Sequence, residues 1–185
     1  EVVTTGGGGS EITNGYVATV DGHPVSGLML TAYSVDFIPG RDVDVTESTV
    51  TAENGYFELE LDDSRVNILA IDSAAQRGFF VSDVGRAERL DTIYLQELGT
   101  VAGTVRVFEA AGGEVAALIP GSPFVTFVAS PDSAFRFEGV PPGRYSLGFY
   151  RILDGAPPCT SGTICNPPTS GEDSFGSLTV SPGAE

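Results

Sequence analysis

The stretch Phe135–Tyr150, FRFEGVPPGRYSLGFY, decides the fold. In its first half phenylalanines alternate with charged residues, and in its second half large apolar residues alternate with small or polar ones. Each half therefore predicts a strand with one apolar face. The Pro141–Gly143 segment between them predicts a tight turn, because proline fixes φ and the following glycine accepts a positive φ. We expect a hairpin whose five large apolar side chains face one core: Phe135, Phe137, Tyr145, Leu147 and Phe149.

The pattern Phe-x-Phe-x-Gly-Val-Pro-x-Gly-x-Tyr-x-Leu in this stretch resembles the closing hairpin of carboxypeptidase regulatory-like domains, which are small transthyretin-like β-sandwiches. Modules of the collagen-adhesin B type share much of the pattern. The resemblance covers roughly residues 12–152 and is clearer in the second half of the chain. It implies a non-catalytic module that belongs to a secreted enzyme or to a cell surface.

Short strand patterns separated by turn signals continue along the rest of the chain. Val66 to Ile71 is almost continuously apolar, as expected of a strand that is buried on both faces. Asn54-Gly55 is a strong hairpin signal, and a weak helix or a loop is expected around Asp83 to Arg89. We therefore predict an all-β protein of two tandem transthyretin-like (immunoglobulin-like) β-sandwich domains with an N-terminal β arm.

An imperfect internal repeat divides the chain. Gly15–Val17 corresponds to Gly103–Val105, and NGYFEL at 54–59 corresponds to DSAFRF at 132–137. Such a repeat indicates two copies of one unit. We place an extended arm with a glycine tether at 1–11, the first sandwich domain at 12–98, and the second at 99–185.

Composition limits the partners. The chain has 185 residues, 25 of them acidic and nine basic, so its formal charge is −16. Such a surface repels phosphate backbones, so we expect no nucleic-acid partner. No apolar run approaches the roughly 20 residues that a membrane-spanning helix needs, so we expect no membrane span. The basic residues are all arginine, which excludes self-made isopeptide bonds that require lysine.

The two cysteines, Cys159 and Cys165, lie between proline pairs in PPCTSGTICNPP. Their spacing does not fit a thioredoxin-type pair, and two ligands are too few for zinc. We predict a local disulfide that stiffens a loop near 157–168. A disulfide implies an oxidising compartment, so we expect an extracellular or cell-surface protein.

The N-terminal residues predict a strand on a tether. Glu1, Val2, Val3, Thr4 and Thr5 include four β-branched residues, and four glycines follow at 6–9. A disordered terminus is the plain alternative. We predict that Glu1–Thr5 is a subunit-interaction arm that adds to a sheet edge of a neighbouring copy, with the glycines as its hinge. The rival prediction is that the arm folds back on its own sheet.

Candidate chemistry is sparse. His23 is the only histidine and lies in a turn, without the neighbours that a hydrolytic triad needs. Two pairs of loop acids, Asp42 with Asp44 and Asp62 with Asp63, offer too few oxygens for Ca²⁺. We therefore predict no catalytic, cofactor or metal site. Four tyrosines are candidates for stacking on sugars if they are exposed, with packing as the alternative: Tyr16, Tyr33, Tyr56 and Tyr150.

These observations favour a non-enzymatic extracellular structural protein, a self-assembling filament or surface-layer subunit joined by β-strand addition. Its partner would be further copies of the same chain. The alternative is an accessory module of a secreted or cell-surface protein that binds a carbohydrate or another ligand, with a polysaccharide as the partner.

Overall fold

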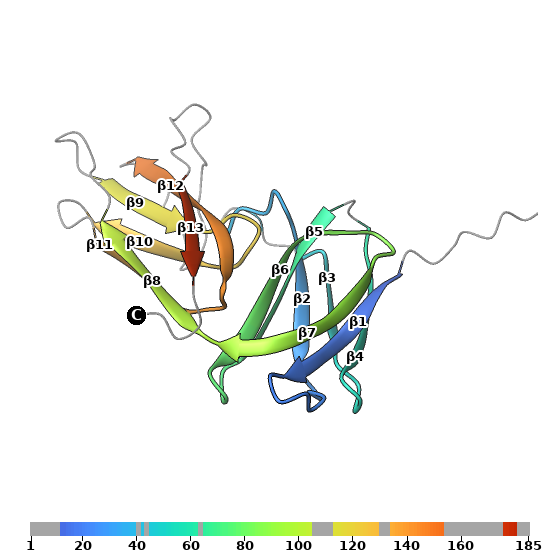
Figure 1. The fold of residues 1–185 in the computed structure, drawn as a ribbon. Coiled ribbons are helices and arrows are strands. Elements are labelled where there is room, and N and C mark those ends of the chain that lie inside the picture. Colours follow the sequence, from blue (N-terminus) through green and yellow to red (C-terminus); the bar gives the residue numbers. More distant parts are fainter. Residues whose placement is uncertain are drawn as a thin grey trace, which may run out of the picture.

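The computed structural model describes residues 12–39, 42, 45–62, 65–104, 113–129, 134–153 and 176–180. Every regular element assigned in these ranges is a strand (Figure 1). In chain order the strands are β1 (Ile12–Thr19), β2 (Met29–Ser34), β3 (Glu47–Val50), β4 (Tyr56–Glu60), β5 (Arg65–Asp72), β6 (Arg77–Gly85), β7 (Arg89–Glu97), β8 (Gly99–Thr104), β9 (Gly113–Leu118), β10 (Val125–Ala129), β11 (Ala134–Val140), β12 (Gly143–Leu153) and β13 (Gly176–Val180). The all-β prediction is confirmed.

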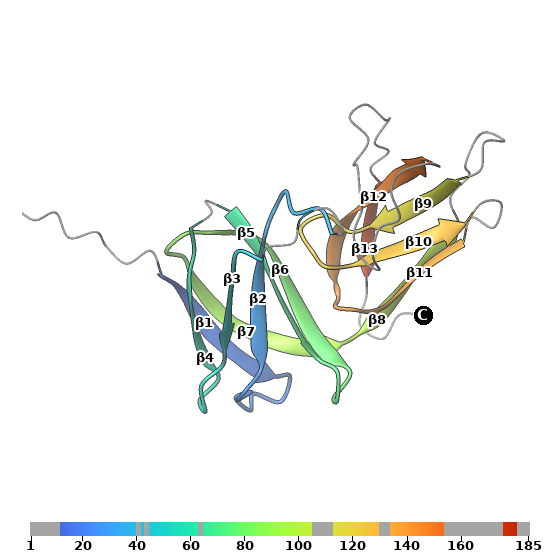
Figure 2. The same cartoon turned by 180° about the vertical axis from the view of Figure 1, so that it is seen from behind.

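Strands β1 to β7, called here the N-terminal unit, form one sheet in the order β3-β2-β5-β6-β7-β1-β4. The sheet folds over at β7, which pairs with β6 only through Arg77–Gly78 and with β1 along most of its length. Two layers result, and Figures 1 and 2 show β7 as the long curved strand that joins them. Their inner faces enclose one apolar core, whose largest fully buried side chain is Phe57.

Strands β8 to β13, called here the C-terminal unit, form a sheet in the order β10-β9-β12-β13 and a two-stranded sheet of β11 and β8. No strand pairing among the described residues joins the two units, and only Leu98 separates β7 from β8. The expected division into two domains near Leu98–Gly99 stays a prediction.

The segment Phe135–Tyr150 forms two strands, but they are not a hairpin. β11 pairs with β8, whereas β12 pairs with β13 through its first half and with β9 through its second half. The chain therefore crosses from one sheet to the other between Val140 and Gly143. Pro141 and Pro142 lack the N–H groups that a hairpin ladder needs. The positive φ also lies elsewhere: at Gly139 (φ 70°), where β11 carries a register shift, and not at Gly143.

The predicted core of this segment is confirmed. Phe135, Phe137 and Tyr145 are buried in one cluster, and Leu147 and Phe149 are half-buried against it. The cluster lies between the two sheets, so both strands put their aromatic rings into it from opposite sides. The buried hydroxyl of Tyr145 donates a 2.7 Å hydrogen bond to the Pro141 carbonyl oxygen, which fixes the crossing.

The internal repeat has a structural counterpart. β1 pairs antiparallel with β4 so that Gly15 lies opposite Phe57, and β8 pairs antiparallel with β11 so that Gly103 lies opposite Phe135. In each pair the phenylalanine ring covers the glycine: a Cβ on Gly103 would lie 2.8 Å from the ring, and one on Gly15 would lie 3.1 Å from it. The corresponding residues of the repeat therefore form the same cross-strand pair in both units.

Two further expectations differ from the structure. Asn54-Gly55 turns the chain, with φ 78° at Gly55, but the strands on either side lie at opposite ends of the sheet order and do not pair. Gly55 is required there, because its carbonyl accepts from the Val17 amide and a Cβ would lie 2.3 Å from the Val17 carbonyl oxygen. Of the weak helix or loop expected around Asp83–Arg89, the structure has a loop, and it is shorter than expected: β6 continues to Gly85, and β7 starts at Arg89.

Two strands are buried on both faces, and together they mark where the units meet. In β5, Val66, Ile68 and Ala70 face the core of the N-terminal unit, whereas Leu69 belongs to a second cluster with Tyr33, Phe37 and Phe124. In β9, alternate residues likewise face the aromatic core and a cluster around Ile38. The two-sided burial predicted for Val66–Ile71 is confirmed, and its second face contacts the other unit.

Backbone hydrogen bonds fix the same junction. The Gly121 amide donates to the Phe37 carbonyl at 2.7 Å, and the buried Asn67 side-chain amide donates to the Gly121 carbonyl at 3.0 Å. The Asn67 side-chain oxygen in turn accepts from the Asp83 amide. Gly121 has φ 70°, and a Cβ on it would lie 2.0 Å from the Asn67 side-chain nitrogen. Only glycine fits this position.

Candidate interaction surface

Several predicted site residues lie outside the part of the chain that the structure describes. These are the arm Glu1–Thr5, its glycine tether at 6–9, both cysteines of the predicted disulfide, and the acids Asp44 and Asp63. The arm and the Cys159–Cys165 bond therefore stay predictions.

The remaining polar candidates occupy structural positions. His23 is exposed in the β1–β2 turn, where its backbone bonds to Thr19. The Asp42 carboxylate accepts a 2.7 Å hydrogen bond from the Ile38 amide and closes its own loop. Within the described ranges, no three His, Cys, Asp or Glu side chains gather closely enough to hold a metal ion. A helix suited to crossing a membrane is likewise not found there.

The tyrosine candidates separate into two groups. Tyr33 is buried in the junction between the units, which is the packing alternative and not the sugar-stacking one, and burial raises its pKa. Tyr16 and Tyr56 face outward as a cross-strand pair of β1 and β4, with ring centroids 5.2 Å apart. The Tyr56 hydroxyl donates to the Glu58 carboxylate at 2.6 Å, and this bond raises the pKa of Tyr56. The side chain of Tyr150 is outside the described set.

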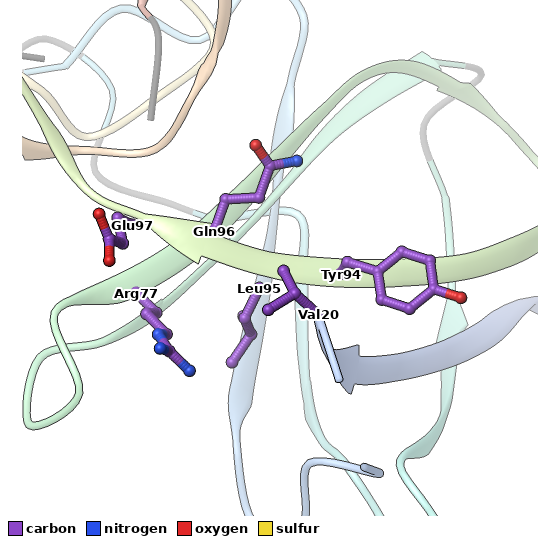
Figure 3. A pocket seen from close by; sticks show the side chains of 6 residues that line it. All are labelled: Val20, Arg77, Tyr94, Leu95, Gln96 and Glu97. Carbon is purple, nitrogen blue, oxygen red and sulfur yellow. The ribbon is translucent and has the colours of Figure 1, made fainter. Parts of the chain in front are cut away.

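A third exposed tyrosine extends this outer surface. Tyr94 on β7 is 46% exposed, and Tyr16 on β1 is 41% exposed. β1 pairs with β7 so that Ala18 lies opposite Tyr94, which puts the two rings on diagonal positions of one sheet. An open depression of about 510 Å³ lies beside Tyr94 and is bounded by Val20, Leu95 and Arg77 among others (Figure 3). The sequence analysis did not select Tyr94. Its neighbours Ile93 and Leu95 face inward, so alternation along the strand turns Tyr94 outward.

The two edges of the N-terminal sheet differ in chemistry. The outward side chains of β4 include Glu58 and Glu60, so that edge is acidic. Around β3 the exposed large side chains are apolar: Val50 is 56% exposed and Met29, its cross-strand partner on β2, is 62% exposed. β3 contains neither lysine nor proline, the residues that commonly protect an edge strand. The β3 edge is therefore the one better suited to accept another strand.

Comparisons with known proteins give distant likenesses. No family model matches the chain, and neither does any curated protein. Among solved structures, a streptococcal ancillary pilin aligns at 17% identity and a TM-score of 0.33, over 94% of this chain and 60% of its own. The minor pilin of Streptococcus agalactiae aligns at 13% identity and a TM-score of 0.33, over 95% and 92%. The Bacillus anthracis TIE protein aligns at 10% identity and a TM-score of 0.33, over 94% of this chain and 32% of its own.

The chain thus spans less than two thirds of the length of the ancillary pilin and of the TIE protein. At these identities and TM-scores the likenesses carry no argument about activity or partners.

Proposed function

We propose that this chain is a non-enzymatic structural subunit of an extracellular or cell-surface assembly, in which Glu1–Thr5 of one copy adds as a strand to the next copy. The observation that carries the proposal is the β3 edge, an end of the seven-stranded sheet that is flanked by the exposed Val50 and Met29. An edge strand presents backbone N–H and C=O groups that a foreign strand can pair with, although β4 also contacts β3.

Charge favours β3 over β4 as the acceptor. The arm begins with Glu1, and the β4 edge carries two acids, Glu58 and Glu60, whereas β3 carries one, Glu47, so pairing at β3 brings fewer like charges together. Five residues span about 17 Å at the rise of a strand, which matches the short β3 edge. Each backbone hydrogen bond contributes only about 1 kcal/mol net, so one arm binds weakly and further contacts between subunits must add to it.

The arm and the acceptor edge are tested separately. Deletion of residues 1–9 should abolish assembly of the purified chain, as measured by light scattering on a sizing column and by negative-stain microscopy. Val50→Lys should weaken assembly because a lysine protects the edge. The matched control is Val20→Lys, since Val20 is 60% exposed but belongs to the lining of the depression beside Tyr94 and not to β3. The proposal is wrong if the intact chain is monomeric at all concentrations or if the truncated chain assembles equally well.

A second function, binding of a neutral polysaccharide, is favoured by the outward tyrosines Tyr16 and Tyr94. Aromatic rings on an open sheet face stack on sugar rings, and the depression beside Tyr94 offers room for one. Retardation in gels containing soluble glucans tests this directly. Tyr94→Ala should remove the retardation if the tyrosines bind the polymer, whereas an unretarded wild-type chain would leave the assembly proposal as the only one.

A further inference from the structure

A cavity of about 340 Å³ lies at the junction between the two units, where β6 and β12 approach each other (Figure 1). Its lining includes the guanidinium-bearing Arg144, the hydroxyl groups of Ser82 and Ser146, and the ring of Phe80. Ligand sites are typically concave, lie between packed units, and combine apolar walls with a few polar groups. The volume is within the usual range for a small ligand.

The charge of this cavity is unusual for the chain. Arg144 is exposed and, within the described ranges, makes no ion pair or hydrogen bond through its side chain. Two other arginines are paired, Arg65 with Asp83 and Arg136 with Glu138, whereas Arg77 and Arg89 make no such pair within the described ranges. None of the described residues that line the cavity is acidic, although the whole chain carries 25 acids. The cavity therefore offers an available cation on a strongly negative molecule.

The carboxylate of Asp83, next to the cavity, does not neutralise the charge of Arg144. Asp83 follows Ser82 in β6, but its carboxylate lies 2.5 Å from the Arg65 guanidinium. The walls are also fixed in place. Asn67 bonds through both ends of its side-chain amide, and the Phe80 ring packs on Tyr145 with centroids 4.8 Å apart. A ligand would thus meet a site that is already ordered, which lowers the entropic cost of binding.

We propose that this cavity binds a carboxylated monosaccharide, either free or as a residue of an acidic polysaccharide. The planar guanidinium of Arg144 fits a carboxylate with two parallel hydrogen bonds. Serine hydroxyls both donate and accept, so Ser82 and Ser146 suit the hydroxyl groups of a sugar. The Phe80 ring provides an apolar wall for the C–H face of the sugar ring. This site is distinct from the β3 edge and from the outward tyrosines, and it does not depend on the proposed assembly.

Titration of the full chain with D-glucuronate, followed by calorimetry at low salt, tests the site, with D-glucose as the matched neutral sugar. Glucuronate should bind measurably tighter than glucose, and added salt should weaken it. Arg144→Gln should weaken glucuronate binding about tenfold or more, because a charge-assisted pair is lost. Arg136→Gln is the control: it removes an arginine that is already paired elsewhere and should leave the affinity unchanged.

A parallel titration with polygalacturonate distinguishes binding of the free sugar from binding of the polymer. Binding of both ligands that depends on Arg144 supports a site for the acidic sugar residue in either form, whereas binding of the monomer alone shows that the cavity is closed to a polymer. Polymer binding that is lost in Tyr94→Ala and kept in Arg144→Gln would move the site to the outer tyrosines and overturn the proposal. Equal affinity for glucuronate and glucose, or no binding of either, would overturn it too.

Discussion

Each unit carries a glycine covered by a phenylalanine from the neighbouring strand. Gly15 lies under Phe57 and Gly103 under Phe135. A glycine in a strand interior normally weakens it, because the residue has no side chain to pack and loses more freedom on folding. Here the ring fills the space that a Cβ would need, so the glycine lets the aromatic side chain lie flat across the sheet. Glycine and phenylalanine at these positions depend on each other.

Gly103→Ala should destabilise the protein by about 1–3 kcal/mol, because the new methyl group displaces the Phe135 ring. The same change in a Phe135→Leu background should cost clearly less, since the ring has gone. A double-mutant cycle from urea unfolding measures this coupling. Strictly additive free energies of unfolding would show that the pair is not coupled.

The contribution of Tyr145 to the stability of the fold should depend on pH. Burial raises its pKa above the value of about 10 that it has in an unfolded chain. Because the folded pKa is the higher one, the stability that the protonated phenol contributes is fully present below about pH 10 and is lost as the pH rises through the folded pKa. Tyr145→Phe should therefore be less stable than the wild type by about 1 kcal/mol near neutral pH, where it lacks the bond to Pro141.

That difference in stability should shrink, and then reverse, above about pH 10, because phenylalanine does not ionise. Urea unfolding of both proteins at neutral and alkaline pH measures it. A gap between wild type and Tyr145→Phe that stays constant across this pH range would mean that burial of the phenol is not coupled to folding.

At the scale of elements, the sequence predicts strands well and their partners poorly. Alternation located both halves of Phe135–Tyr150, because side chains alternate between the faces of a strand whichever strand it pairs with. Strand pairing depends on contacts between residues that lie far apart in the sequence. Two turns with hairpin signals, Asn54-Gly55 and Pro141–Gly143, instead connect strands that do not pair with each other. The repeat was the more informative signal, since it matched residues that form equivalent pairs.

Phe137→Ala tests the core between the two sheets of the C-terminal unit. Phe137 is 4% exposed, so the change should cost about 3–5 kcal/mol in free energy of unfolding. Phe127→Ala is a matched control from the same unit, because Phe127 is 39% exposed, and it should cost much less. Equal losses in urea unfolding would show that burial of Phe137 does not stabilise this core.

The cysteine loop gives a prediction for the segment between β12 and β13. Cys159 and Cys165 should be bonded to each other, and closing so short a loop contributes on the order of 2 kcal/mol. Intact-mass measurement after alkylation, with and without reductant, decides the question. Two alkylated thiols in the native, unreduced protein would contradict both the bond and the oxidising compartment inferred from it.

Surface function was harder to predict than the core. Tyr33, Tyr16 and Tyr94 all occur in alternating patterns, but alternation does not say which face meets solvent and which meets another unit. Tyr33 is buried in a cluster that joins Phe37 and Leu69 of its own unit to the partly buried Phe124 of the C-terminal unit. The Arg144 cavity depends on both units, so no local motif signals it. Sites built from distant segments are invisible until the packing of the units is known.

At the scale of the whole molecule, the two units are joined by more than the single residue Leu98. The apolar cluster of Tyr33, Phe37 and Leu69 with the partly buried Phe124, and the hydrogen bonds of Gly121, connect them. Buried apolar contact of this kind resists independent motion of two units. We therefore expect the units to unfold together, and the Arg144 cavity to keep its shape in solution.

Gly121→Ala tests this coupling, and Gly27→Ala is its matched control. Both glycines have a positive φ near 70°, so alanine is strained at both and costs about 1 kcal/mol at each. A Cβ on Gly27 meets nothing within 4 Å, whereas a Cβ on Gly121 would lie 2.0 Å from the Asn67 side-chain nitrogen. Gly27→Ala should thus keep one cooperative transition in calorimetry. Gly121→Ala should lower stability further and split the transition in two, because the clash forces the turn away from Phe37 and Asn67. Identical behaviour of the two variants would mean that the junction contributes nothing to the coupling of the units.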